Sequence, residues 1–214
     1  MKFPILNRFT RETICEIELD ASYEYKPRSV QLGAAVKIAF SKNINLTYAK
    51  LTEANLAGAN LTHADLTYAN LAWADLAGAK LAGADLTCAD LTYTNLAGAD
   101  LTHADLTCAY LAHAKLAGAD LTCAYLTYTN LADADLAGQG ILQINGLRWP
   151  VLVTPANMTI GCEQHSHDDW RGFDDRRILQ MADKTGLKFW AENKNWLFER
   201  CVWATGFQKK EDTA

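Results

Sequence analysis

Leucine recurs at every fifth position through the middle of this 214-residue chain, from Leu46 to Leu136, which is 19 times without a gap. Two residues before each leucine stands an alanine in nearly every case, and the other three positions are mostly small or polar. A period of five fits neither an amphipathic helix, whose period is 3.6, nor a strand, whose period is two. We therefore expect a chain that turns a corner every five residues, with leucine and alanine pointing inward.

A second period of 20 residues overlies the first. The position two residues after leucine is glycine in every fourth repeat, and an alanine precedes each one: Gly58, Gly78, Gly98, Gly118 and Gly138. Three more columns keep this spacing, namely Tyr48, Tyr68, Cys88, Cys108 and Tyr128, then Glu53, Trp73, Tyr93, His113 and Asp133, then His63, Gly83, His103 and Cys123. Four corners per turn predict a square coil of 20 residues, and such coils stack about 4.8 Å apart through backbone hydrogen bonds.

The repeat over residues 44–140 resembles the pentapeptide-repeat family, whose consensus A(D/N)LXX most of its repeats meet. This resemblance implies a right-handed quadrilateral β-helix, which makes the fold class mainly β. The departures from the consensus are Ile44, Thr94, Thr129 and Gln139 at the alanine position, and Tyr110 and Tyr125 where Asp or Asn is usual. We expect each departure to bulge a corner locally without breaking the solenoid.

The segment before the repeat is expected to cap it. An open solenoid exposes an unpaired coil edge and a slice of its core, which invites end-to-end association. Cys15, Ile17 and Leu19 alternate with acidic residues, as in a strand with one wet face. Helical spacing of apolar residues begins after Ser29, with Leu32, Ala35, Val36, Ala39 and Phe40. We therefore predict that residues 1–43 form a strand–helix cap.

The segment after the repeat, residues 141–214, predicts a small α+β domain that caps the other end. Residues 151–154 and 158–162 fit two short strands around a turn at Pro155. Ser166 and Asp169 have the spacing of a capping box for a short helix. Asp174 fits the cap of a longer helix that Gly186 would disturb, and a final helix would follow around Trp196.

The C-terminal segment also resembles uncharacterised accessory proteins of tailed bacteriophages and prophages that carry a Trp-rich C-terminal domain. The matching residues are Ile160, Gly161, Cys162, His165, Ser166, Trp170, Phe173, Asp175, Ile178 and Met181. This resemblance implies a phage origin and indicates no activity.

Composition and charge narrow the class of protein. The formal net charge of the chain is −5, and the repeat is more acidic than the two flanking segments. The first residues lack the pattern of a signal peptide, and no apolar stretch reaches the 18 residues that a membrane span needs. Six cysteines without a compact framework then fit reduced thiols. We expect a cytoplasmic protein, in the host cytosol if it is phage-encoded, with no membrane partner.

Residues suited to catalysis or metal binding are few. Cys162, His165 and His167 are the weak candidates for a metal site, but their C-x2-H-x-H spacing is not a standard zinc arrangement. We interpret them as a buried cysteine and two histidines beside a helix cap. The sequence has no phosphate loop, nucleophile elbow or dinucleotide fingerprint. We therefore predict neither an enzyme nor a cofactor.

Cys88 and Cys108 should lie about 5 Å apart on adjacent coils, as free thiols in a reducing cytosol.

Three functions remain open. The first is a non-catalytic scaffold that binds a host or phage protein and inhibits a host nucleic-acid enzyme or defence system. The flat glycine column would allow another backbone to approach closely, so a homodimer is one form that binding could take. The second is a DNA mimic, which the family resemblance implies because members that resemble duplex DNA and bind topoisomerases are known. The third is a metal- or thiol-dependent activity in the C-terminal domain.

The DNA mimic would act through two acidic columns, and no direct binding of nucleic acid is expected. The columns are Asp65, Asp85 and Asp105, and Asp100 and Asp120. Nearly five coils make a rod of about 24 Å, the length of about seven base pairs. Duplex DNA carries one charge per roughly 1.7 Å of its axis, whereas the repeat would carry about half that density. The comparison favours the scaffold over the mimic.

Overall fold

The computed structural model describes residues 1–136, 142–144, 151–154, 157–160, 163–181 and 184–208. The chain divides into two compact units, residues 1–137 and residues 138–214. The first unit contains the N-terminal segment and the repeat, and the second contains a sheet with three helices.

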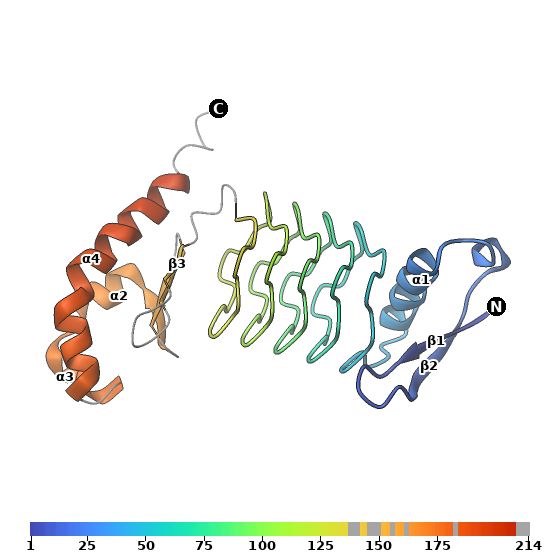
Figure 1. Ribbon diagram of the computed structural model, residues 1–214, viewed down its shortest axis with the longest axis horizontal. Coiled ribbons are helices and arrows are strands. Elements are labelled where there is room, and N and C mark those ends of the chain that lie inside the picture. The colour runs from blue at the N-terminus through green and yellow to red at the C-terminus, as the bar shows by residue number, and fades with distance from the viewer. Residues whose placement is uncertain (137–141, 145–150, 155–156, 161–162, 182–183, 209–214) are drawn as a thin grey trace. The chain divides into compact units, whose positions relative to one another are not determined.

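The repeat is a right-handed β-helix of stacked square coils (Figure 1). The leucines and the alanines two residues before them point inward, and Leu51, Ala54 and Leu56 are fully buried. Parallel bridges join residues 20 apart, from Lys50–Asn70 to Lys115–Asp135. Neighbouring coils are bound by backbone hydrogen bonds in both directions, such as Leu51 N to Asn70 O at 2.7 Å. The predicted period of 20 residues and the inward positions are therefore confirmed.

Each corner of the coil is a turn with a left-handed residue two positions after the leucine. The φ angle lies between 55° and 68° at this position in every repeat from Tyr48 to Asp133. Tyrosine, tryptophan, cysteine and histidine adopt this conformation here as well as glycine. The turn alone therefore does not account for the glycine column.

The departures at Thr94, Thr129, Tyr110 and Tyr125 do not bulge the coil, so the expectation is wrong at these positions. Thr94 and Thr129 are buried, and their hydroxyls donate to the carbonyls of Leu71 and Leu106 at 2.9 and 2.8 Å. The hydroxyl thus finds an acceptor inside the coil. Tyr110 and Tyr125 point outward and keep the bridges to the preceding coil. Gln139 lies outside the described residues.

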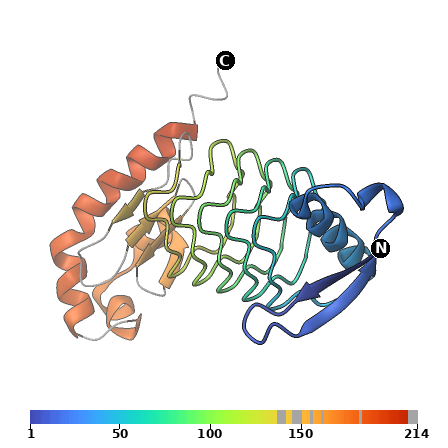
Figure 2. The ribbon, with the colours of Figure 1, turned by 45° about the vertical axis from the view of Figure 1, so that its right-hand side comes forward.

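The N-terminal segment covers the first coil (Figure 2). Strands β1 (Lys2–Leu6) and β2 (Thr13–Glu18) pair antiparallel, a short 3-10 helix spans Ala21–Tyr23, and α1 spans Arg28–Ser41. The sequence predicted one strand here, and β1 is an addition. Lys50 N donates to Leu6 O at 2.7 Å, and Asn55 N donates to Ser29 O at 3.0 Å. The edge of the first coil therefore finds backbone acceptors in the N-terminal segment.

Helix α1 packs with its backbone directly against the first coil. A Cβ atom built on Gly33 would lie 1.8 Å from the carbonyl oxygen of Asn55. This contact fixes the distance between the helix and the coil, because no residue larger than glycine fits without movement.

The described residues of the second unit form a four-stranded antiparallel sheet and three helices. The strands β3 (Leu142–Ile144), β4 (Val151–Val153), β5 (Asn157–Ile160) and β6 (Glu163–Ser166) lie in sequence order. Helices α2 (His167–Gly172), α3 (Asp175–Met181) and α4 (Lys184–Gln208) follow. Their core is built from Val151, Val153, Met158, Trp170, Ile178, Phe189, Trp190, Leu197 and Cys201.

Two local predictions for this unit have different outcomes. Ser166 and Asp169 form the capping box at the start of α2, with both reciprocal bonds present. The expected disturbance at Gly186 and the separate final helix are wrong, because α4 runs unbroken from Lys184 to Gln208. Among the described residues, no helix is both long and apolar enough to cross a membrane.

Candidate binding surface

The repeat presents four sides, each built from every fourth repeat. We name them after their outward residues. The acidic side comprises residues 44–48, 64–68, 84–88, 104–108 and 124–128, and the aromatic side comprises 49–53, 69–73, 89–93, 109–113 and 129–133. The glycine side comprises residues 54–58, 74–78, 94–98 and 114–118, and the histidine side comprises 59–63, 79–83, 99–103 and 119–123. The acidic and aromatic sides are consecutive in every coil and share a corner.

In many repeats the Asp or Asn before the leucine accepts a hydrogen bond from the backbone amide two residues later. Asp65 Oδ1 accepts from the amide of Thr67 at 3.1 Å and from its hydroxyl at 2.7 Å. Asp85 and Asp105 accept in the same way from the amides two residues on, each at 2.9 Å. These carboxylates therefore close the turn, and an amide oxygen could do the same.

The predicted column Asp65, Asp85 and Asp105 exists on the acidic side. Bridges join the first residue to the second and the second to the third, and the next coil places Tyr125 in the column. No lysine or arginine occurs in the five segments of this side, so the three charges are not offset there. The acidic column is therefore real but only three coils long.

The second predicted column, Asp100 and Asp120, lies on the histidine side below Lys80, and bridges join the three residues. Two bonds from Thr102 lower the pKa of Asp100, first from its hydroxyl and then from its amide. Burial opposes this shift, and the charge of Lys80 adds to it. Because a lysine continues the column, this side is not a pure acidic stripe.

Exposed aromatic rings of the repeat gather on the acidic and aromatic sides. They are Tyr48, Tyr68, Trp73, Tyr93, Tyr110, Tyr125 and Tyr128. The segments of the glycine and histidine sides contain no Phe, Trp or Tyr at all. The spacing in the sequence already places these aromatic residues in columns. The fold adds that the columns lie on two adjacent sides, so that the rings share one surface.

A ladder of stacked rings follows the corner between the aromatic and glycine sides. Trp73 and Tyr93 stack with ring centres 4.2 Å apart and planes 6° apart, and Tyr93 and His113 stack at 4.6 Å and 15°. Trp73 is nevertheless 59% exposed. His113 Nδ1 lies 4.0 Å from the carboxylate of Asp133. The ladder is therefore ordered by its own stacking while it remains open to solvent.

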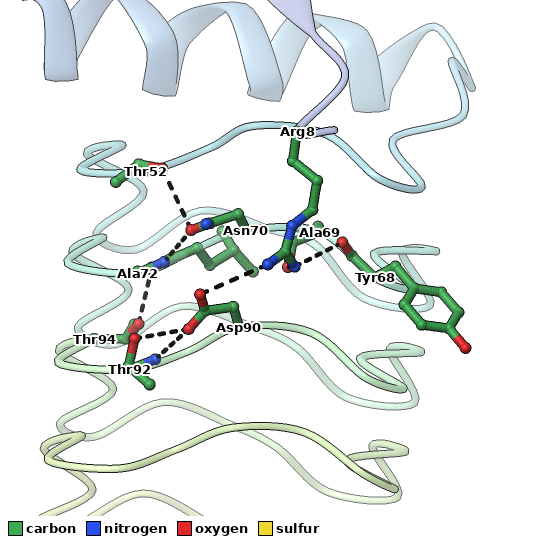
Figure 3. Close-up of polar contacts among 10 residues, drawn as sticks. Arg8, Thr52, Tyr68, Ala69, Asn70, Ala72, Asp90, Thr92 and Thr94 are labelled. Carbon is green, nitrogen blue, oxygen red and sulfur yellow. Dashed lines mark hydrogen bonds and ion pairs between the residues drawn. The ribbon is translucent and has the colours of Figure 1, made fainter. Parts of the chain in front are cut away.

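Arg8, at the tip of the β1–β2 hairpin, binds the corner between the acidic and aromatic sides (Figure 3). Its Nη1 donates to the carbonyls of Tyr68 and Ala69 at 3.0 and 3.2 Å. Its Nη2 lies 3.7 Å from a carboxylate oxygen of Asp90. The sequence analysis missed Arg8, because its partners lie 60 or more residues away and no local pattern marks it.

The same corner carries the two thiols predicted to be neighbours, and Tyr68 lies beside them. Interaction with Cys88 raises the pKa of Tyr68, and burial together with Cys88 raises the pKa of Cys108. For Cys108, burial is the larger cause of the raised pKa. Both cysteines are free thiols and half-buried.

The glycine column is bare. A Cβ atom at Gly58, Gly78, Gly98 or Gly118 would meet no atom within 4 Å, so internal packing does not demand glycine there. Gly138 lies outside the described residues. The column is consistent with a flat face, but nothing beside it indicates a ligand.

The metal candidates of the C-terminal unit are not assembled into a site among the described residues, where no group of three or more potential ligands occurs. His165 Nε2 lies 3.2 Å from a carboxylate oxygen of Glu163, and its ring meets the ring of Trp170 edge-on. His167 is buried, which lowers its pKa, and the backbone of Asn157 and Thr154 opposes this shift. Cys162 lies outside the described residues.

The repeat matches the family model described as pentapeptide repeats, with eight copies, over residues 42–76, 69–107 and 104–138. Residues 42–138 therefore match the repeat of this family, as the resemblance of the sequence predicted. No curated protein matches the chain.

Solved structures of other pentapeptide repeat proteins are similar to part of the chain. The protein Rfr23 from the cyanobacterium Cyanothece 51142 is 42% identical over 40% of this chain and 58% of its own, with a TM-score of 0.40. A protein from the thylakoid lumen of Arabidopsis thaliana is 31% identical over 42% of this chain and 62% of its own, with a TM-score of 0.25. QnrB1, a plasmid-mediated fluoroquinolone resistance protein, is 18% identical over 37% and 49%, with a TM-score of 0.21. The chain thus spans less than two thirds of each relative.

Proposed function

We propose that the repeat domain is a non-catalytic scaffold that binds a protein partner through its acidic and aromatic sides together. The observation that carries this proposal is the gathering of the seven exposed aromatic rings on two adjacent sides. Scattered single apolar residues are normal on a protein surface, whereas a contiguous patch marks a site of interaction. Tyrosine and tryptophan are also the residues most enriched among the strongest contributors to protein interfaces.

The order of the surface supports the same proposal. The ladder of Trp73, Tyr93 and His113 is held by ring stacking, and Arg8 ties the hairpin to the corner beside it. Binding to a surface that is already ordered loses little side-chain entropy, so more of the contact energy appears as affinity.

The test compares three versions of the full chain as baits in a bacterial lysate. Trp73→Ala with Tyr93→Ala removes the ladder, and His103→Ala on the histidine side is the control. Because all three side chains project outward from the coil, circular dichroism should show equal folding. Proteins retained by the natural chain and by the control should be lost from the double variant. Retention of the same proteins by all three baits would contradict the proposal.

A DNA mimic that inhibits a DNA-binding enzyme, such as a topoisomerase, is the second candidate, and the acidic column favours it. Its three charges recur about every 4.8 Å, which is sparser than the roughly 3.4 Å between phosphates of one DNA strand. Substituting Asp65, Asp85 and Asp105 together by Asn removes the charges and keeps the acceptors that close the turns. A mimic would lose its partner and the salt dependence of binding, whereas a scaffold that binds through the aromatic rings of these two sides would keep its partner.

We further propose that the partner is a host or phage protein and that the chain itself is phage-encoded and acts in the host cytosol. The support is the resemblance of the C-terminal motif around Ser166 and Trp170 to phage accessory proteins. In this setting the scaffold would inhibit a host nucleic-acid enzyme or defence system. The proteins identified by the capture experiment test this part as well, since an abundant metabolic enzyme as the sole partner would contradict it.

A further inference from the structure

Cys88 and Cys108 occupy equivalent corners of two adjacent coils. Cys88 N donates to Thr107 O at 2.9 Å, and Asp85 and Asp105, three residues before the cysteines, are bridged. The φ angles of the two cysteines are 55° and 58°, so their Cα–Cβ bonds leave the backbone in nearly the same direction. The nearby Cys88 thiol also contributes, after burial, to the raised pKa of Cys108.

The spacing of the coils is compatible with a bond between these sulfurs. Neighbouring strands lie about 4.8 Å apart, inside the range of roughly 4.4 to 6.8 Å between Cα atoms of disulfide-bonded cysteines. Parallel Cα–Cβ bonds place the Cβ atoms at a similar distance, a few tenths of an ångström beyond the usual upper value of about 4.5 Å. A small local shift of the two corners would close the gap.

We propose that Cys88 and Cys108 form a reversible disulfide across two coils, by exchange with a small disulfide such as oxidised glutathione. One cysteine thiolate attacks a sulfur of glutathione disulfide, which forms a mixed disulfide and releases one glutathione thiolate. The thiolate of the second cysteine then attacks the sulfur of the first, and the second glutathione leaves. In total the two protein thiols lose two electrons and two protons, and one glutathione disulfide takes them up and becomes two molecules of reduced glutathione.

The other described cysteines do not offer the same arrangement. Cys123 is exposed at the histidine side, where the preceding coil places His103 in its column. Cys15 lies on β2, and Cys201 is buried in the core of the second unit, where burial raises the pKa of its thiol to about 11. Reaction with glutathione disulfide therefore distinguishes the two cases. The proposed pair forms a disulfide within the chain, whereas a single thiol can only form a mixed disulfide with glutathione.

The experiment incubates the full chain with oxidised and reduced glutathione at several ratios at pH 8, then blocks free thiols with iodoacetamide. Digestion of the denatured protein by an endoproteinase that cleaves before aspartate cuts between the two cysteines, at Asp90, Asp100 and Asp105. Mass spectrometry should find the Cys88 and Cys108 peptides joined, without glutathione, and dithiothreitol should separate them. The joined fraction should rise with the proportion of oxidised glutathione.

Two variants sharpen the result. Cys108→Ala should convert the product to a glutathione adduct on Cys88, and Cys123→Ala should leave the joined peptides unchanged. Circular dichroism checks that both variants keep the coil. Glutathione adducts on both Cys88 and Cys108 of the natural chain, or a disulfide of either residue with Cys123 or with a second molecule, would overturn the proposal.

Discussion

The Asp or Asn before each leucine acts first on its own turn. Its side-chain oxygen accepts from the amide two residues on, for instance from Ala72 in the case of Asn70. Lysine at position 80 and tyrosine at position 110 keep the same bridges to the neighbouring coils. The consensus residue thus stabilises the turn locally, and the chain is free to vary charge at this position from side to side.

Substitutions of Asp100 can separate the contribution of the turn hydrogen bonds to stability from the contribution of the negative charge. Asp100→Ala should lower the free energy of unfolding by about 1 kcal/mol, because it removes the acceptor for the Thr102 amide and hydroxyl. Asp100→Asn keeps an acceptor and should cost less than half as much. Urea unfolding at pH 7 measures both values, and equal losses for the two variants would show that charge, not the turn bond, is what matters.

The pH dependence of Asp100 gives an independent check. The bonds from Thr102 lower its pKa in the folded chain below the ordinary value of 3.8. Its charged form therefore contributes stability that is fully present above pH 3.8 and is lost as the pH falls through the lower folded value. The difference in stability between the natural chain and Asp100→Asn should be constant near neutral pH and shrink below pH 3.8. A difference that grows in acid would contradict the assigned cause.

At the scale of elements, the contact between α1 and the first coil depends on one residue. Gly33→Ala should destabilise the first unit by about 2 kcal/mol or more, since the added Cβ would overlap the carbonyl of Asn55. The direction of the change in stability is informative, because replacing glycine by alanine within an ordinary exposed helix stabilises the helix by about 1 kcal/mol. Lys37→Ala, on the exposed face of the same helix, is the control. Thermal unfolding of both variants measures the change in stability. A higher midpoint temperature for Gly33→Ala than for the natural chain would refute the close packing.

The side chain of Arg8 adds to the backbone bonds that attach the hairpin to the first coil. Arg8→Ala should loosen the hairpin by roughly 1.5 to 3 kcal/mol, because two bonds to carbonyls and the ion pair with Asp90 are lost. Hydrogen exchange should then accelerate at the amides of residue 8 and Lys50, which pair the hairpin with the first coil. Lys2→Ala breaks only an exposed ion pair with Glu16 and should leave these amides unchanged. Unaltered exchange in Arg8→Ala would show that the strand pairing alone holds the hairpin.

The repeat was predictable because every coil repeats the same information. The periods of five and 20 residues fix which side chains are buried and which stack, so the columns of Tyr68, Trp73 and Cys88 could be assigned in advance. Elements that occur once lack this redundancy. Strand β1 contains Pro4, a residue that argues against a strand in the sequence, and α4 continues through Gly186 despite the lower helix propensity of glycine.

The candidate surface was less predictable than the fold for the same reason. Each aromatic column could be derived from spacing, but the contact of Arg8 with Tyr68 joins residues 60 positions apart. Only the folded chain brings them together. Likewise, the interior bonds of Thr94 depend on the carbonyl of Leu71, 23 residues earlier, so the sequence suggested a bulge where the coil accommodates the hydroxyl.

At the scale of the whole molecule, the two compact units should unfold as separate cooperative transitions. Residues 1–137 bury stacked leucines, whereas residues 138–214 have a core of their own around Trp170 and Trp190. Chains with more than one such core commonly depart from two-state unfolding. Tryptophan offers a convenient reporter, because five of the six tryptophans follow residue 138 and only Trp73 lies in the repeat.

In a Trp73→Phe background, all tryptophan fluorescence therefore comes from the second unit. Trp170→Phe should lower the midpoint detected by fluorescence, since it leaves a cavity and removes the bond of 2.6 Å from the indole to Met158 O. The expected loss is about 2 to 4 kcal/mol. Gly33→Ala in the same background should leave that midpoint in place and lower the transition of the repeat seen by circular dichroism. If either substitution moved both transitions equally, the two cores would form one cooperative unit, and separate unfolding would be refuted.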